Sequence, residues 1–293
     1  MAAIETDLSI RWAGYRGELQ SDYYLQELPE KDYYIFHDLR YPSGQSHFQI
    51  DSLILTRYFA LHLEVKNISG SISFNEDFSQ IIQRKNDVEK GYQDPISQAA
   101  IHQRKLQKLM ASWGISKLPL VNLVVFGKPS TILQAGTKRA QISRKVCFAF
   151  ELLERIESLR KVYLDEKIGL KEIEKLCNNL IKYHTPKSFD PLQFYTISPA
   201  DVITGVQCPA CSSFGMLRKH GSWICPKCNC KSKDAHVQAI LDYLLLVDST
   251  ISNRKCCEFL HLSSPFIANY LLSTMNLSHS GSNKGRLYFL TES

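Results

Sequence analysis

The sequence has no long apolar run. No segment approaches the ~18 uninterrupted apolar residues expected of a membrane-spanning helix, and the opening residues MAAIETDLSIRW lack the basic-then-apolar pattern of a secretory signal. We therefore expect a protein that has no membrane partner and lies in the cytoplasm.

The chain also lacks a strong excess of charge of one sign. Its net charge is +6 over 293 residues, which permits a polyanionic partner but does not require one. The excess is local, because residues 205–233 hold five Lys and Arg residues and no Asp or Glu. With 44% hydrophobic and 22% charged residues, the composition is that of a globular protein, and the length favours two or three domains.

The nine cysteines do not form an even set of disulfide partners, and four of them lie in two C-P-x-C units, Cys208–Cys211 and Cys225–Cys228. This pattern favours metal binding in a reducing compartment over disulfides. Two tight turns that each present two thiolates predict a closed tetrahedral site for structural Zn²⁺, and we interpret residues 206–233 as a zinc ribbon. A redox dithiol is the alternative, and a register with Cys230 in place of Cys228 stays open.

Apolar periodicity predicts the order of elements before the cysteines. We expect a helix at 14–28, strands at 33–39, 48–56, 58–66 and 72–82, a helix at 95–113 and a buried strand at 119–127. The order αβββαβ predicts an α/β class with a mixed sheet flanked by helices. A strand at 145–150 and helices at 151–159 and 170–183 follow. Residues 184–205 carry three prolines and no clear periodicity, so we interpret them as a linker after a first domain at 1–183.

Asp51, Glu64 and Lys66 place charges in the two apolar strands of the expected hairpin QIDSLILTRYFALHLEVKN, residues 49–67. Glu64 and Lys66 share one strand face, and a turn near Thr56 makes it possible for Asp51 to approach Glu64. Two carboxylates in a partly desolvated site need compensating cations or water. Mg²⁺ accepts one or two carboxylates together with water and phosphate oxygens, which suits phosphodiester hydrolysis. From the spacing alone, the alternative is a solvated strand face on which Asp51 caps the strand.

Four motifs carry a resemblance to a known family: Gly17-Glu18, Gln49-Ile50-Asp51, Leu63-Glu64-Val65-Lys66-Asn67 and Asp94-Pro95-Ile96-Ser97-Gln98. Together they resemble the nuclease-related domain (NERD) family of the PD-(D/E)xK nuclease superfamily, over roughly residues 12–130. The expected element order is similar to the restriction-endonuclease-like core of that superfamily.

The resemblance implies roles for individual residues. Asp51 and Glu64 would bind Mg²⁺ or Mn²⁺, Lys66 would be the catalytic lysine, and Glu18 and Gln98 would support the same centre. Asp94 stands where the family usually has asparagine, and we expect this change to affect the turn before the helix more than the chemistry.

Other polar groups near these motifs have no role in the resemblance. Gln98, His102 and Lys105 share a helix face that can follow a phosphate backbone. We assign no ligand role to His47, His62 or His102, because a lone histidine is usually structural.

Residues 234–293 carry signals of three helices and a hairpin. Two short helices joined by a turn at His261-Leu262-Ser263, the second capped by Ser263 or Ser264, indicate a helix-turn-helix. The stretch SHSGSNKGRLYFL follows as a wing. The tail resembles a winged-helix domain of transcriptional regulators over 236–291. Its expected recognition helix, Pro265 to Ser273, has no Arg or Lys, which weakens base reading and leaves protein contacts as an alternative.

The sequence as a whole predicts a Mg²⁺-dependent nuclease that hydrolyses phosphodiester bonds of DNA, in DNA processing or repair, with RNA as the alternative substrate. The ribbon and the winged-helix tail would guide it to nucleic acid, through Arg218, Lys219, Trp223, Asn269, Lys284 and Arg286. The rival interpretations are a non-catalytic nucleic-acid-binding or regulatory protein with an idle nuclease fold, and a protein-docking scaffold. Homo-oligomers are common among nuclease folds, but no interface can be identified from the sequence.

Overall fold

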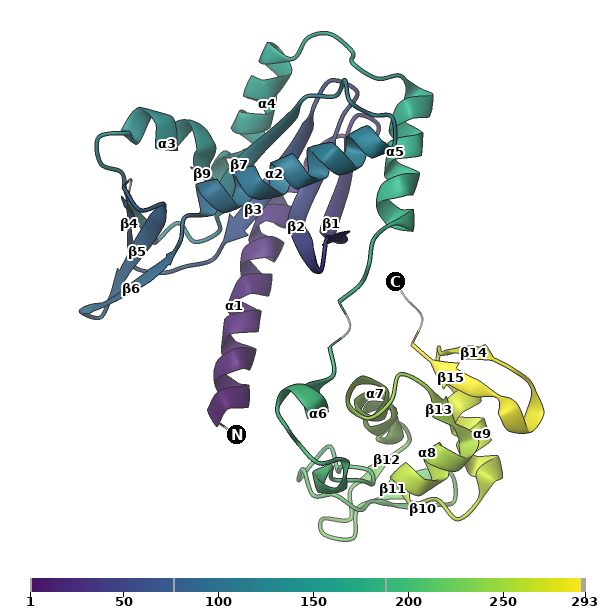
Figure 1. Cartoon of the computed structure of the whole chain (residues 1–293). Coiled ribbons are helices and arrows are strands. Elements are labelled where there is room, and N and C mark those ends of the chain that lie inside the picture. Colours follow the sequence, from purple (N-terminus) through teal and green to yellow (C-terminus); the bar gives the residue numbers. More distant parts are fainter. Residues whose placement is uncertain (1, 76, 188, 291–293) are drawn as a thin grey trace. The chain divides into compact units, whose positions relative to one another are not determined.

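The computed structural model describes residues 2–75, 77–187 and 189–290. The chain divides into two compact units, Met1–Lys187 and Ser188–Ser293 (Figure 1). The division falls inside the segment 184–205 that was expected to be a linker, although the structure forms two short helices there, at 191–194 and 199–201. In the described ranges, no helix has the length and apolar character needed to cross a membrane.

The first unit is a mixed sheet covered by helices. Its elements in chain order are α1 (Ala2–Leu25), β1 (Tyr34–Ser43), β2 (Ser46–Leu55), β3 (Ala60–Lys66), β4 (Ser71–Asn75), β5 (Gln80–Lys85), β6 (Val88–Gln93), α2 (Pro95–Ser112), β7 (Leu120–Phe126), β8 (Ile132–Gln134), α3 (Arg139–Lys145), β9 (Val146–Phe148), the 3-10 helix η1 (Ala149–Glu151), α4 (Leu152–Val162) and α5 (Leu170–Lys182). The main sheet has the order β1-β2-β3-β7-β9. Strands β1 to β3 are antiparallel, and β3, β7 and β9 are parallel. The predicted mixed α/β sheet flanked by helices is confirmed.

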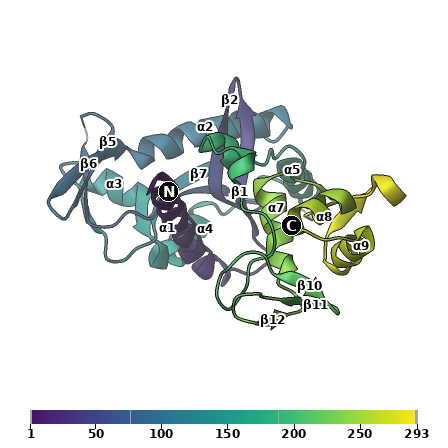
Figure 2. The ribbon, with the colours of Figure 1, turned by 90° about the horizontal axis from the view of Figure 1, so that it is seen from below.

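Helices bury both faces of this sheet. Ala60 of β3 belongs to a core that includes Leu106 of α2 and Leu176 of α5, whereas Leu61 belongs to a core that includes Ile156 of α4. Figure 2 shows α2 and α4 on opposite sides of β7. Because both faces are covered, β3 is a nearly continuous buried run, and any charge on it has little contact with water.

The structure differs from the expected elements at several positions, and β8 and α3 were not expected at all. Helix α1 begins at Ala2, not at residue 14. The expected single strand 72–82 is wrong: the chain forms β4 and β5, because the Asn75 side chain accepts from the Asp77 amide at 3.2 Å and Ser79 takes a left-handed φ of 49°. Strand β6 was not predicted, and a two-residue turn with positive φ at Asn86 and Asp87 joins it to β5. These strands form a second sheet, β6-β5-β4-β8.

The second unit contains two more small sheets. Its elements are α6 (Pro191–Phe194), η2 (Pro199–Asp201), β10 (Leu217–Lys219), β11 (Ser222–Ile224), β12 (Lys231–Ser232), α7 (His236–Leu246), β13 (Ile251–Ser252), α8 (Asn253–Leu260), α9 (Pro265–Thr274), β14 (Ser278–Ser280), η3 (Asn283–Gly285) and β15 (Leu287–Phe289). The sheets are β10-β11-β12 and β13-β15-β14.

The cysteine region and the helical tail of this unit share one core. Val206 and Trp223 from the cysteine region are buried in the same cluster as Ile240 of α7 and Leu260 of α8. A hairpin turn with positive φ at His220 and Gly221 joins β10 to β11. After residue 235 the structure has the three expected helices and the expected hairpin together with an unexpected strand, β13, and the winged-helix assignment remains a prediction.

Helix α1 lies very close to the end of β3 at Gly17. A Cβ atom built on Gly17 would lie 2.6 Å from the Cβ of Asn67, closer than side chains pack. The Asn67 side-chain amide also donates to the carbonyl of Ala13. The absence of a side chain at Gly17 therefore sets the position of α1, and with it the position of the following residue, Glu18.

We expect Gly17→Ala to lower the free energy of unfolding of the first unit by about 1–3 kcal/mol, because overpacking forces α1 away from β3. Gly14→Ala is the matched control, since nothing lies within 4 Å of its Cβ position and alanine favours a helix by up to ~1 kcal/mol. Denaturant-dependent hydrogen exchange of β3 amides in the full chain measures both. Equal stability of the two variants would contradict the close approach.

Candidate functional site

The predicted carboxylates come together at the junction of β2 and β3. The antiparallel register pairs Ser52 with Leu63, so Asp51 and Glu64 are the next opposed positions. Asp51 is held by the backbone amide of Val65, which donates to its Oδ2 at 2.8 Å. The side chains thus approach one another as the strand pattern predicts.

The surroundings of Asp51 disfavour its charged form. Burial raises its pKa first and the neighbouring Glu64 carboxylate raises it further, to about 7, although the Val65 amide and the Lys66 ammonium oppose the shift. Two carboxylates so close together do not both ionise easily without a cation. Neighbouring carboxylate oxygens are the donor type that fits a hard divalent ion.

Glu64 lies at the centre of the site, with 2% of its side chain exposed. Lys66 Nζ donates to Glu64 Oε1 at 2.7 Å and to Gln98 Oε1 of α2 at 3.2 Å. Burial opposes ionisation of Glu64, but His102 and Lys66 outweigh it and hold its pKa below the ordinary value. The structure therefore places Glu64, Lys66 and Gln98 in one hydrogen-bonded chain between β3 and α2.

Two further residues of the NERD-like motifs, Glu18 and Asp94, have identifiable surroundings in the structure. Glu18 is half-buried, and burial followed by the charges of Asp38 and Asp22 raises its pKa. Its charge acts on Asp51 as well, so it lies on the acidic side of the same centre. Asp94 is the N-cap of α2 and accepts from the amides of Ile96 and Ser97 at 3.0 and 3.1 Å. The expected effect of Asp94 on the turn matches this capping.

Sequence reasoning missed two histidines of the site. His102 Nδ1 lies 3.2 Å from Glu64 Oε2, and His62 Nε2 lies 3.9 Å from the same oxygen. His62 is completely buried, and burial lowers its pKa to about 4. The sequence contains a signal for each histidine. His62 precedes Glu64 by two positions and therefore shares its strand face, and His102 follows Gln98 by four positions and therefore shares its helix face. His47, which was left aside with them, is exposed.

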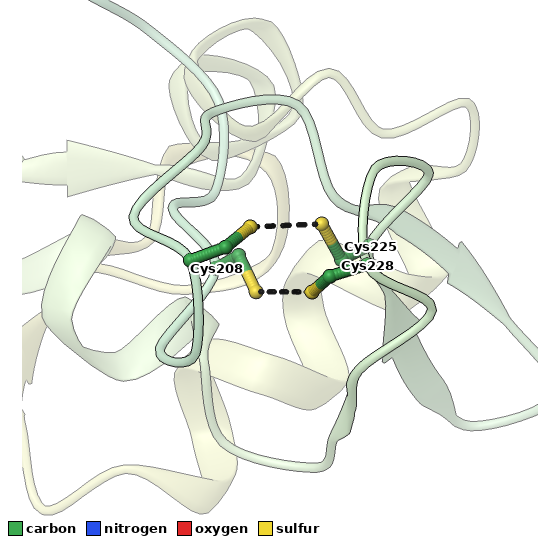
Figure 3. A group of neighbouring side chains, drawn as sticks. Cys208, Cys225 and Cys228 are labelled. Atoms are coloured by element: carbon green, nitrogen blue, oxygen red, sulfur yellow. Dashed lines mark hydrogen bonds between the residues drawn. The ribbon is translucent and has the colours of Figure 1, made fainter.

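The four paired cysteines form a second cluster. Their sulfur atoms all lie within 4.8 Å of one another, with Cys208 and Cys228 at 3.6 Å and Cys211 and Cys225 at 3.6 Å (Figure 3). Sulfur atoms bonded at about 2.3 Å to one tetrahedral Zn²⁺ would be separated by about 3.8 Å. The four residues are therefore arranged to hold a metal ion, whereas a disulfide would need a much shorter distance.

The backbone explains how each cysteine pair is presented. Ser212 and Asn229 both have φ 57°, and their amides donate to the carbonyls of Cys208 and Cys225 at 2.9 Å. These left-handed residues close the two turns. Cys230 is not part of the cluster, so among the described residues the structure favours Cys228 over the alternative register.

The prediction that Trp223 offers a stacking surface to nucleic acid is wrong. Its ring is 1% exposed in the core of the second unit, and its Nε1 donates to His236 Nδ1 at 3.2 Å. Arg218 lies over this ring, with its guanidinium carbon 5.4 Å from the centroid, so part of its surface is also taken. Lys219 is exposed.

The other predicted contacts lie in the tail. Asn269 is exposed on α9, but its Oδ1 accepts from Asn253 at 3.3 Å and from Tyr288 at 3.4 Å. Arg286 is half-buried, and the side chain of Lys284 lies outside the described residues. Among the predicted contacts whose side chains are described, Lys219 is therefore the charged residue that is most accessible to a ligand.

We expect Cys225→Ser to remove bound zinc and to unfold the second unit, including α7 and α8, because a structural zinc site supplies on the order of 10 kcal/mol of folding free energy. Cys230→Ser is the matched control and should retain both the bound zinc and the folded second unit. Zinc content and the fluorescence of buried Trp223 measure the two effects. Full zinc content in Cys225→Ser would remove this residue from the ligand set.

Comparison with known proteins finds a family match within the first unit. Residues 13–127 match the family model described as the nuclease-related domain, NERD, close to the range 12–130 expected from the motifs. No curated protein and no solved structure matches the chain. Glu18, Asp51, Glu64, Lys66 and Gln98 all lie inside the matched segment, which indicates a nuclease-related function. Residues 13–127, less than half of the chain, are thus similar to the nuclease-related domain family.

Proposed function

We propose that the first unit is a Mg²⁺- or Mn²⁺-dependent nuclease that hydrolyses phosphodiester bonds of DNA. The observation that carries the proposal is the convergence of Asp51, Glu64 and Lys66 in a buried site of a nuclease-related domain. RNA is the alternative substrate, and DNA processing or repair is the proposed setting.

Asp51 and Glu64 would hold the divalent ion, which when bound polarises the phosphate and lowers the pKa of its water. The chain's own residues do the rest. One carboxylate oxygen of Asp51 accepts a hydrogen bond from the Val65 amide, and this bond fixes the orientation of the other carboxylate oxygen. Gln98 accepts from Lys66 and positions its ammonium beside Glu64. From there Lys66 can orient an attacking water or neutralise the charge that develops on the phosphoryl oxygens.

The second unit would bring this site to nucleic acid. In this proposal it is a zinc ribbon joined to a winged-helix-like tail. Lys219, Lys227, Lys231 and Lys233 are exposed, and residues 205–233 contain no acid. A surface whose charges are all positive binds phosphates with an affinity that falls as the salt concentration rises. Trp223 supports the surface from inside the core and does not stack on bases.

The nuclease proposal predicts that purified zinc-loaded chain nicks plasmid or cuts single-stranded DNA when Mg²⁺ or Mn²⁺ is added. Asp51→Asn, Glu64→Gln and Lys66→Met should each reduce the rate by at least about a hundredfold, since each removes a charge from the site. Glu89→Gln and Lys90→Met, on the exposed strand β6, are the matched controls and should cut like the wild type.

A different outcome would favour a different class of protein. If no substrate is cut, but DNA is retained equally by the wild type and the three site variants without magnesium, the site is catalytically idle. The chain would then be a nucleic-acid-binding or regulatory protein with a nuclease fold.

The docking proposal predicts that Lys219→Ala and Lys231→Ala each weaken duplex DNA binding uniformly across sequences. Each should also reduce the slope of log affinity against log salt by about 0.9, the contribution of one phosphate contact. Lys90→Ala in the first unit is the control. An unchanged slope in both ribbon variants would favour a protein-docking role for this unit.

A further inference from the structure

Glu64 presents its two carboxylate oxygens to two different sets of partners. Oε1 accepts from Lys66 of the nuclease-like site. Oε2 faces His102 Nδ1 at 3.2 Å and His62 Nε2 at 3.9 Å. The nuclease proposal uses the first oxygen and leaves the second, together with both histidines, without a role.

These atoms are buried without hydrogen-bond partners. Among the described residues, both ring nitrogens of His62, Glu64 Oε2 and His102 Nδ1 are inaccessible to solvent and make no hydrogen bond. His62 is 0% exposed. Leaving buried polar atoms unpaired is costly, so most such atoms in proteins have a partner. Three of these atoms, His62 Nε2, Glu64 Oε2 and His102 Nδ1, lie around one small volume, and they point to a ligand that accepts electron pairs from nitrogen and oxygen.

The spacing of the three side chains suits a metal ion. His62, Glu64 and His102 each offer a ligand atom, and these atoms lie within 4.8 Å of one another. Two atoms bound at about 2.0–2.2 Å to one ion are separated by about 3.0–3.4 Å at ordinary coordination angles. The pair His102 and Glu64 already has this separation. His62 Nε2, at 3.9 Å from Glu64 Oε2, lies about half an ångström beyond it.

The donor types restrict the metal. Mg²⁺ and Ca²⁺ prefer oxygen ligands, whereas imidazole nitrogen suits first-row transition metals, and two histidines with one carboxylate are a common set for such ions. Asp51 and Glu64 offer oxygen alone. The two ends of the Glu64 carboxylate therefore favour different ions.

We propose that His62 Nε2, Glu64 Oε2 and His102 Nδ1 form a second metal site, for a divalent first-row transition metal such as Mn²⁺, Fe²⁺, Co²⁺ or Zn²⁺. Glu64 would bridge this ion to the one held with Asp51. The site does not depend on the proposed nuclease function, because its ligands can bind an ion in a chain that cuts nothing.

Mn²⁺ is the probe that separates this site from the others. It does not displace Zn²⁺ from four thiolates, so the zinc-loaded full chain can be used. Pulsed electron paramagnetic resonance of bound Mn²⁺ detects the nitrogen of a coordinated imidazole. We expect this nitrogen signal in the wild type, its loss in His62→Gln and His102→Gln, and the loss of one bound Mn²⁺ per chain in each variant. His47→Gln, which changes an exposed histidine, should keep both.

Asp51→Asn separates this proposal from the nuclease proposal. That variant should lose DNA cleavage but retain the nitrogen-coordinated Mn²⁺. A wild type that shows the nitrogen signal and cuts no substrate would support the second site while refuting the nuclease. Bound Mn²⁺ without a nitrogen signal in the wild type would overturn the second site. This measurement uses the wild type alone, so it does not depend on whether a variant folds. A nitrogen signal that persists in both histidine variants would overturn it as well.

Discussion

The buried charge of Glu64 is the constraint around which the first unit is arranged. A carboxylate with 2% of its side chain exposed stays ionised only if the surroundings compensate it, because the interior solvates charge poorly. Lys66 supplies that compensation from the same strand, and α2 adds Gln98 and His102 from the facing helix. The position of α2 across β3 therefore matters for electrostatics as well as for packing. Asp94, which caps the start of α2, helps to fix both.

Helix α1 contributes to the same centre by a steric route. Its contact with the end of β3 depends on the missing side chain of Gly17, and the next residue, Glu18, adds its charge to the field felt by Asp51. A close backbone approach and a half-buried acid that acts on Asp51 thus come from adjacent positions.

The sequence predicted what depends on local periodicity and spacing, and missed what depends on packing between distant elements. Strand alternation was enough to bring Asp51, Glu64 and Lys66 together, and the two C-P-x-C units were enough to predict the cysteine cluster. The hairpin of β5 and β6 was missed because its turn residues, Asn86 and Asp87, were not recognised as a left-handed turn. Trp223 was misplaced because a basic neighbourhood in sequence does not reveal which side of a small sheet faces a core. His62 and His102 meet only when α2 crosses β3, which no single segment indicates.

The shared core of the second unit has a consequence for how this part of the chain is assembled. The cysteine turns and the helices α7 and α8 bury their apolar residues in one cluster, so neither has a complete interior without the other. If the four thiolates bind Zn²⁺ as proposed, the helices α7 and α8 would complete their core only together with the metal-bound turns. Metal binding and the folding of the whole second unit would then be one coupled step.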